Sequence, residues 1–100
     1  MNDKNNPINI EINDEIAQGT YSNLAVITHS TSEFIVDFVR IMPGMPKAQV
    51  KSRIILTPQH AKRLSKAIAE NVKRFEKAHG EIKDYEEQPI PLNFGPKGEA

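Results

Sequence analysis

The sequence predicts an α+β fold, an antiparallel sheet of about four strands followed by one long C-terminal helix in the order β-β-β-β-α. Two observations support this prediction. Up to Leu56, short runs of alternating apolar and polar residues are separated by turn-forming residues, which is typical of strands. After Thr57-Pro58, apolar residues recur every three or four positions, as they do on one face of a helix.

The strands are expected to form a meander, in which each strand reverses into the next. Turn residues follow the first strand, and Gly19 predicts a bulge or bend near the start of the second. Pro43-Gly44 predicts a tight reversal, because proline presets the first torsion angle of a turn and glycine accepts a positive φ. The expected strands cover residues 8–12, 17–29, 33–41 and 48–56. One face of the last strand is expected to carry Ala48, Val50, Ile54 and Leu56.

The helix has the clearest boundaries of any predicted element. Thr57 can cap the first free amide groups, Pro58 suits the first helical position, and Gly80 suits the C-terminal cap. A helix over residues 58–79 would span roughly 33 Å at 1.5 Å per residue. Its apolar positions are Ala61, Leu64, Ala67, Ile68, Val72, Phe75 and Ala78.

A chain of 100 residues is long enough for one domain with a modest core. We expect a disordered N-terminus over residues 1–7, a single α+β domain over 8–80, and an acidic, proline-rich tail over 81–100. Three apolar residues alternate within that tail, and they are expected to dock onto the body or onto a neighbouring chain. These residues are Ile90, Leu92 and Phe94.

Residues 33–41 are apolar on both faces of a strand, because neighbouring side chains of a strand point to opposite sides of the sheet. One helix about 10 Å across cannot cover a sheet roughly 15–20 Å wide, so one face lacks an obvious cover. We therefore expect a homo-oligomer, a dimer or a tetramer, with the tail as the alternative cover. The candidate interface consists of Phe34, Ile35, Val36, Phe38, Val39, Ile41, Met42 and Met45.

Composition excludes several kinds of chemistry. The absence of cysteine rules out disulfides and thiolate metal sites. The three histidines do not have the spacing of a metal motif, and the chain contains neither a glycine-rich phosphate loop nor a hydrolase serine elbow. We expect a non-catalytic protein without a cofactor. The polar N-terminus, without the apolar stretch of a signal peptide, and the lack of a membrane-length apolar run predict a cytoplasmic protein with no membrane partner.

Asp37 lies within the central strand between apolar neighbours, Ile35 and Val36 before it and Phe38 and Val39 after it. A carboxylate among apolar neighbours needs a partner, and Arg40, Arg53 or Lys51 could supply it. Because no nucleophile, second carboxylate or metal cluster accompanies Asp37, an ion pair at an interface is favoured over a catalytic role.

The zero net charge conceals a segregation of charge along the chain. Residues 1–46 carry two bases and six acids, residues 47–77 nine bases and two acids, and residues 78–100 two bases and five acids. The basic middle could attract a polyanion, or the acidic tail or a partner chain could neutralise it. The candidate polyanion-binding residues are Lys51, Arg53, Lys62, Arg63, Lys66, Lys73 and Arg74.

Several segments together resemble a family of small bacterial and archaeal proteins known as domain of unknown function 3467. The resemblance covers roughly residues 8–82. It is carried by Gly19-Thr-Tyr-Ser-Asn23, Glu33-Phe-Ile-Val-Asp-Phe38, Pro43-Gly44, Arg53-Ile-Ile-Leu-Thr-Pro-Gln-His-Ala-Lys62 and Gly80-Glu-Ile82. It implies no particular activity, ligand or site residue.

Two analogies of fold suggest functions, although neither comes with a diagnostic motif. The order of four strands and a helix is similar to a protomer of the SecB export chaperone, which assembles as a tetramer and holds unfolded chains on apolar surfaces. The same order is similar to single-stranded nucleic-acid binders of the coactivator and whirly type. We expect an adaptor-like or chaperone-like protein that binds another polypeptide; the alternative is a single-stranded nucleic-acid-binding module that uses the basic helix face.

Overall fold

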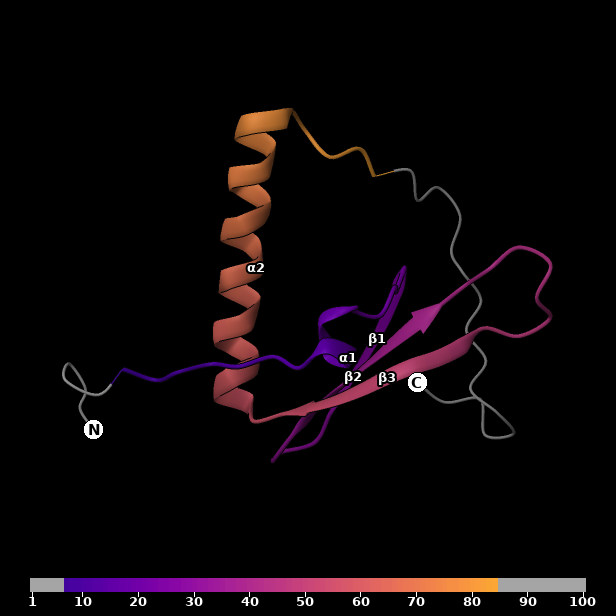
Figure 1. Ribbon diagram of the computed structural model, residues 1–100, viewed down its shortest axis with the longest axis horizontal. Coiled ribbons are helices and arrows are strands. Elements are labelled where there is room, and N and C mark those ends of the chain that lie inside the picture. The colour runs from indigo at the N-terminus through magenta and orange to yellow at the C-terminus, as the bar shows by residue number, and fades with distance from the viewer. Residues whose placement is uncertain (1–6, 85–100) are drawn as a thin grey trace.

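The computed structural model describes residues 7–84, which form a three-stranded antiparallel sheet followed by a long helix (Figure 1). The elements are α1 (Asp14–Ala17), β1 (Leu24–His29), β2 (Phe34–Arg40), β3 (Gln49–Leu56) and α2 (Pro58–His79). The predicted α+β class and the order of sheet and helix are confirmed. The expectations for residues 1–6 and for the apolar residues of the tail fall outside the described residues.

The first predicted strand differs from the structure. Residues 7–13 belong to no strand, and a one-turn helix, α1, follows them where a turn was expected. Asn13 caps this helix by accepting a hydrogen bond from the amide of Ile16 at 2.8 Å. Gly19, at φ +80°, ends it with a bend, so β1 begins at Leu24 and not near residue 17. Alternation showed that residues 8–12 suit a strand, but a strand also needs a backbone partner.

The sheet order is β1-β2-β3, so each strand pairs with its neighbour in sequence. The predicted Pro43-Gly44 reversal is confirmed. The amide of Met45 donates to the carbonyl oxygen of Met42 at 3.3 Å, and Gly44 has φ +82°, as the third residue of a type II turn requires.

A bulge in β3 changes which residues share a face. Phe38 lies opposite Ser52 but Val39 lies opposite Val50, so Lys51 has no partner on β2. The register therefore places Val50 on the face of Val39, not on the face of Ile54 and Leu56. The prediction that Val50, Ile54 and Leu56 share one face is wrong for Val50, because strict alternation cannot anticipate an inserted residue.

The core is small and centres on β2. Within residues 7–84, the buried apolar side chains are Val26, Val36, Val39 and Leu56, and the buried polar one is Asp37. Val36 and Val39 lie on opposite faces of the central strand. Each of them has a neighbour on β1 and another on β3, which explains why burial is concentrated on β2.

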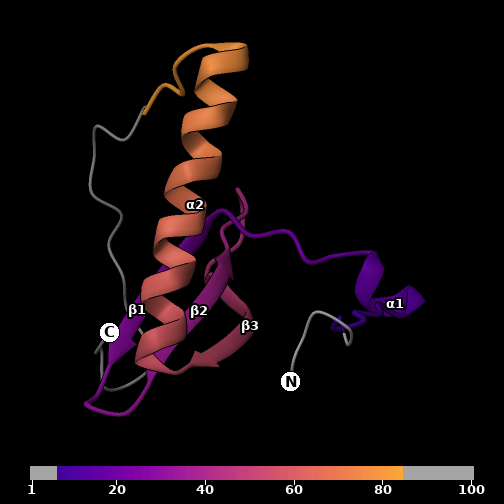
Figure 2. The same cartoon turned by 90° about the vertical axis from the view of Figure 1, so that its left-hand side faces the viewer.

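Helix α2 begins as its sequence predicts. The side-chain oxygen of Thr57 accepts a hydrogen bond from the amide of His60 at 3.1 Å, and Gly80 follows the last turn at φ +96°. The helix starts beside the end of β3 and rises at an angle to the strands, so that its upper turns lie beyond the sheet (Figures 1 and 2). No residue of α2 is buried.

Candidate interaction surfaces

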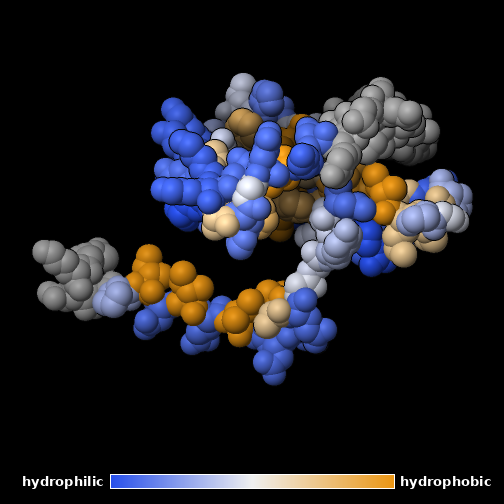
Figure 3. All heavy atoms as spheres, turned by 90° about the horizontal axis from the view of Figure 1, so that it is seen from above, coloured by the Kyte–Doolittle hydropathy of each residue, from blue (hydrophilic) through white to orange (hydrophobic). Residues whose placement is uncertain are grey.

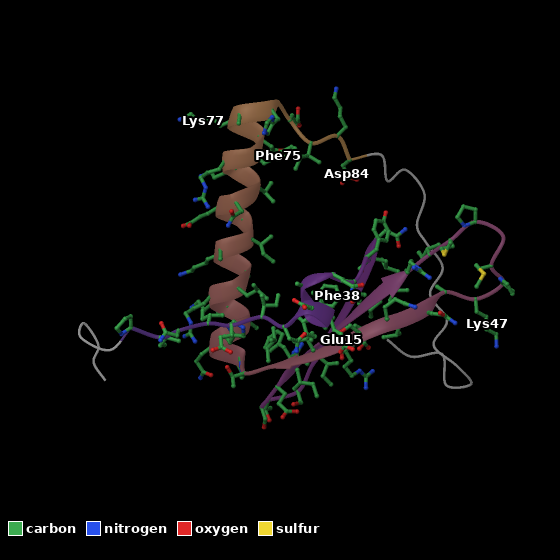
Figure 4. All side chains as sticks on the ribbon, viewed as in Figure 1. Glu15, Phe38, Lys47, Phe75, Lys77 and Asp84 are labelled. Atoms are coloured by element: carbon green, nitrogen blue, oxygen red, sulfur yellow. The ribbon has the colours of Figure 1, made fainter. Side chains whose placement is uncertain are left out.

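The largest exposed apolar feature of the helix is a row of four side chains, here called the α2 stripe: Leu64, Ile68, Val72 and Phe75. Their spacing of three and four residues places them on one side of α2. Ile68 is 54% exposed and Phe75 is 51% exposed. In Figure 4, Phe75 points toward the side of the helix on which the sheet lies, whereas Lys77 points to the opposite side. The half-buried residues of α2 are Pro58, Ala61 and Glu76, and none of them belongs to this row.

A second exposed apolar feature is the N-terminal arm, defined as residues 7–13. Ile8 and Ile10 are 86% and 89% exposed, and Ile12 is exposed as well. Figure 3 shows this arm standing clear of the rest of the molecule, with hydrophobic atoms along it. The alternation of isoleucine with polar residues thus belongs to a segment that has no strand partner among residues 7–84.

The predicted interface residues of β2 and the following turn lie in different environments. Val36 and Val39 are buried within the chain, so its own side chains already cover them. Phe34, Ile35, Phe38 and Ile41 are half-buried, and Met42 and Met45 are exposed beside the Pro-Gly turn. The structure therefore does not bring these eight residues together as one open patch. The uncovered apolar surface lies mainly on α2, on the arm and on the outer strands.

The length of α2 was the signal that could have revealed the exposed stripe. A helix of 22 residues spans roughly 33 Å at 1.5 Å per residue, whereas a strand of eight residues spans roughly 27 Å. A helix longer than the strands extends beyond the sheet, so its upper turns cannot be covered by the strands. The large exposed apolar residues of the outer strands are Ile27, Val50, Ile54 and Ile55.

Asp37 and Arg53 form an ion pair across β2 and β3, where they lie directly opposite each other. Nε of Arg53 donates to Oδ1 of Asp37 at 2.7 Å, and a terminal guanidinium nitrogen donates to Oδ2 at 2.9 Å. Asp37 is only 4% exposed, whereas the Arg53 side chain is 58% exposed. Of the three partners considered for Asp37, the structure selects Arg53, from the same chain.

This geometry explains the electrostatics of the pair. The hydrogen bonds from Arg53 hold the pKa of the Asp37 carboxyl below its ordinary value, and the positive charge adds to the lowering, although burial acts in the opposite direction. The same contacts raise the pKa of Arg53. The carboxylate is therefore held ionised and bidentate, an arrangement that secures the register of the two strands.

The predicted basic residues separate into two groups. Lys62, Arg63, Lys66, Lys73 and Arg74 are all exposed on α2, at positions that lie away from the α2 stripe. Arg53 is engaged by Asp37, and Lys51 lies at the bulge of β3. A guanidinium nitrogen of Arg74 also donates to the side chain of Asn71 at 2.9 Å. The helix therefore carries an apolar side and a basic side.

Two of the histidines contact aromatic rings. His29 stacks on Phe34 with ring centroids 5.1 Å apart, and His79 lies 4.8 Å from Phe75. Within residues 7–84, no group of three or more histidine, aspartate or glutamate side chains is placed to hold a metal ion. No helix in that range has both the length and the apolar character that a membrane crossing requires.

The comparisons with known proteins are consistent with the motifs described above. The sequence model of the family described as "Protein of unknown function (DUF3467)" matches residues 1–84. No curated protein and no solved structure was found to match the chain. Since the family match spans most of the sequence, including the arm, the sheet and α2, the chain belongs to the DUF3467 family.

Proposed function

We propose that this protein is a non-catalytic polypeptide-binding protein, adaptor-like or chaperone-like, that acts as a homo-oligomer in the cytoplasm. The observation that supports the proposal best is the α2 stripe, four large apolar side chains that are 36–54% exposed within the described residues. Full burial of a fully exposed side chain of this kind contributes about 1.5–3 kcal/mol, and a partner that covers the exposed part of each would gain roughly half of that per residue.

The shape of the stripe favours a polypeptide over a small molecule. From Leu64 to Phe75 the row runs roughly 16 Å along the helix, at 1.5 Å per residue. An extended chain of about five residues covers that length, and an amphipathic helix could lie along it in the same way. Small-molecule ligands instead favour concave sites that enclose most of their surface.

The proposal is tested by binding to a reduced, unfolded protein at low and high salt. We expect binding to persist at high salt, because apolar contacts are not screened by ions. The double substitution Ile68→Gln with Val72→Gln, in the middle of the stripe, should weaken binding at least tenfold. Both residues are exposed, so the fold tolerates the change.

The matched control is Lys66→Gln with Glu70→Gln on the other side of α2. It also places two glutamines four residues apart, and like the test variant it leaves the net charge unchanged. The control should bind as the natural protein does. Equal loss in both variants, or loss of all binding at moderate salt, would contradict the proposal.

A second candidate function rests on the basic side of α2, where six lysine and arginine side chains are exposed: the five candidate polyanion-binding residues of the helix and Lys77. Such a surface could follow the phosphate backbone of single-stranded DNA or RNA. Substituting Lys62, Arg63 and Lys66 with glutamate should then abolish binding to mixed oligonucleotides, and the affinity of the natural protein should fall steeply with salt. No shift of any oligonucleotide at low salt would exclude this alternative.

A further inference from the structure

We propose that the N-terminal arm of one copy pairs as an added strand with the outer edge of β3 in a second copy. The inference rests on the homo-oligomer part of the proposed function, and it names the segments that meet. It concerns residues 8–12, which alternate as a strand does and which the structure leaves exposed and unpaired. In a second copy they would supply a fourth strand.

The connection between the arm and the sheet holds the arm away from its own strands. Asn13 caps α1, and the amide of Gly19 donates to the carbonyl oxygen of Ile16 at 3.0 Å. Asn23 then hydrogen-bonds through its side-chain amide to both the carbonyl oxygen and the amide of Ile41, at 3.0 and 2.9 Å. These contacts set the path of residues 13–23, and the arm stands clear of the body (Figure 3).

The acceptor is the free edge of β3, which within the described residues pairs only with β2. Unpaired backbone groups on a sheet edge are a template for another strand. Beside this edge lie Ile54 and Ile55, both exposed, and the exposed guanidinium of Arg53. The other free edge belongs to β1, which carries no lysine or arginine. It therefore has no basic side chain of that kind to pair with Glu11 of the arm.

Charge and apolar pattern together select one antiparallel register. If Glu11 of the arm lies opposite Arg53, every isoleucine of the arm falls on the same face as Ile54 and Leu56. That face already carries Val36 in the centre of the sheet. Arg53 can donate hydrogen bonds to a second carboxylate, because the ion pair with Asp37 uses only Nε and one terminal nitrogen. The pairs are Ile8 with Leu56, Ile10 with Ile54, Glu11 with Arg53 and Ile12 with Ser52.

The register predicts a disulfide between two different chains. The chain has no cysteine, so every disulfide that forms must come from the introduced cysteines. Copies with Ile10→Cys and copies with Ile54→Cys, carrying different tags, are mixed and oxidised with oxidised glutathione. Residues directly opposite in an antiparallel pair have Cβ atoms roughly 4.5–5.5 Å apart, close to what a disulfide requires. We expect a covalent product that carries both tags.

The matched control mixes Asn9→Cys with Ile54→Cys. Asn9 is one residue away but on the other face of the arm, so its product should be at least fivefold less abundant. Equal yields would overturn the proposal. A disulfide that forms only within single chains, when Ile10→Cys and Ile54→Cys are combined, would overturn it as well.

Sedimentation of the natural protein separates this inference from the proposed function. If the protein is an oligomer but the mixed disulfide is no more abundant than in the control, the pairing of the arm with β3 is wrong and the proposed function stands. A single chain at every concentration up to 100 μM, roughly the level at which weak specific complexes are populated, overturns the oligomer and the exchange together.

Discussion

At the residue scale, Val39 and Val50 offer a direct measure of what burial contributes in this sheet. They lie opposite each other across β2 and β3, yet Val39 is 3% exposed and Val50 is 47% exposed. Val39→Ala should lower the free energy of unfolding by about 2 kcal/mol, through lost apolar burial and the cavity left behind. Val50→Ala should cost well under about 1 kcal/mol.

Denaturant unfolding of both variants at one protein concentration measures the difference. The two substitutions delete the same atoms from directly opposed positions, so each serves as the control for the other. Similar losses would mean that Val50 is covered in solution by something beyond the described residues, which would itself point to a partner on β3.

Asp37 makes stability depend on pH at the acidic end. Its folded-state pKa is lowered from the ordinary value of 3.8 by Arg53, so the ion pair stabilises the fold fully above that pH. The contribution is lost as the pH falls through the folded-state value, because the unfolded carboxyl then binds a proton more readily than the folded one does.

We expect Asp37→Asn to be less stable than the natural protein at pH 7, and the gap to narrow below pH 3.8. Denaturant midpoints of both proteins between pH 2 and pH 7, read as a difference at each pH, provide the measurement. Arg53 stays charged throughout, since its pKa is raised. A difference that does not change with pH would assign the effect of the substitution to packing alone.

At the scale of elements, the start of α2 depends on one side-chain oxygen. Thr57 accepts a hydrogen bond from the amide of His60, and its replacement by alanine leaves that amide without its cap. Thr57→Ala should cost about 1 kcal/mol, whereas Thr57→Ser, which keeps the oxygen, should cost much less. Helical circular dichroism during thermal unfolding compares the two. Equal midpoints would show that the tertiary setting of Leu56 and Pro58 starts the helix without the cap.

The elements that the sequence predicts well are those whose signals are local. Thr57-Pro58 and Gly80 bound α2 because capping involves residues a few positions apart, and Pro43-Gly44 determines its turn by its own torsion angles. The sequence shows that Asp37 needs a basic partner, and it offered three candidates. It could not select Arg53, because the register between β2 and β3 is not visible in the sequence.

The elements that were predicted wrongly or incompletely depend on contacts distant in sequence. Residues 8–12 have the alternation of a strand, but pairing requires a neighbour that no local pattern reveals. The face predicted for Val50 was wrong because β3 contains one extra residue, Lys51, that shifts the alternation. The α2 stripe has the spacing of a core face, and whether such a face is covered depends on the angle at which the helix crosses the sheet.

At the scale of the whole molecule, the balance between buried and exposed apolar groups is unusual for an isolated chain. Within residues 7–84, four apolar side chains are buried, whereas the exposed ones include every large residue of the α2 stripe and of the arm. Domains of this size depend on their core to offset the entropy of ordering the chain. Association between copies would supply the missing burial.

The thermal midpoint of the natural protein should therefore rise with its concentration. If only folded chains associate, mass action adds about 2.7 kcal/mol per dimer for a hundredfold increase in concentration at 25 °C. Scanning calorimetry between 1 and 100 μM, roughly a hundredfold range around the affinity of a weak dimer, detects this shift. The variant with Ile68→Gln and Val72→Gln should shift much less if the stripe joins copies, and as much as the natural protein if it is reserved for another polypeptide. A midpoint of the natural protein that is independent of concentration would mean that one chain is stable alone. The exposed stripe and arm would then have to bind molecules other than a second copy of this chain.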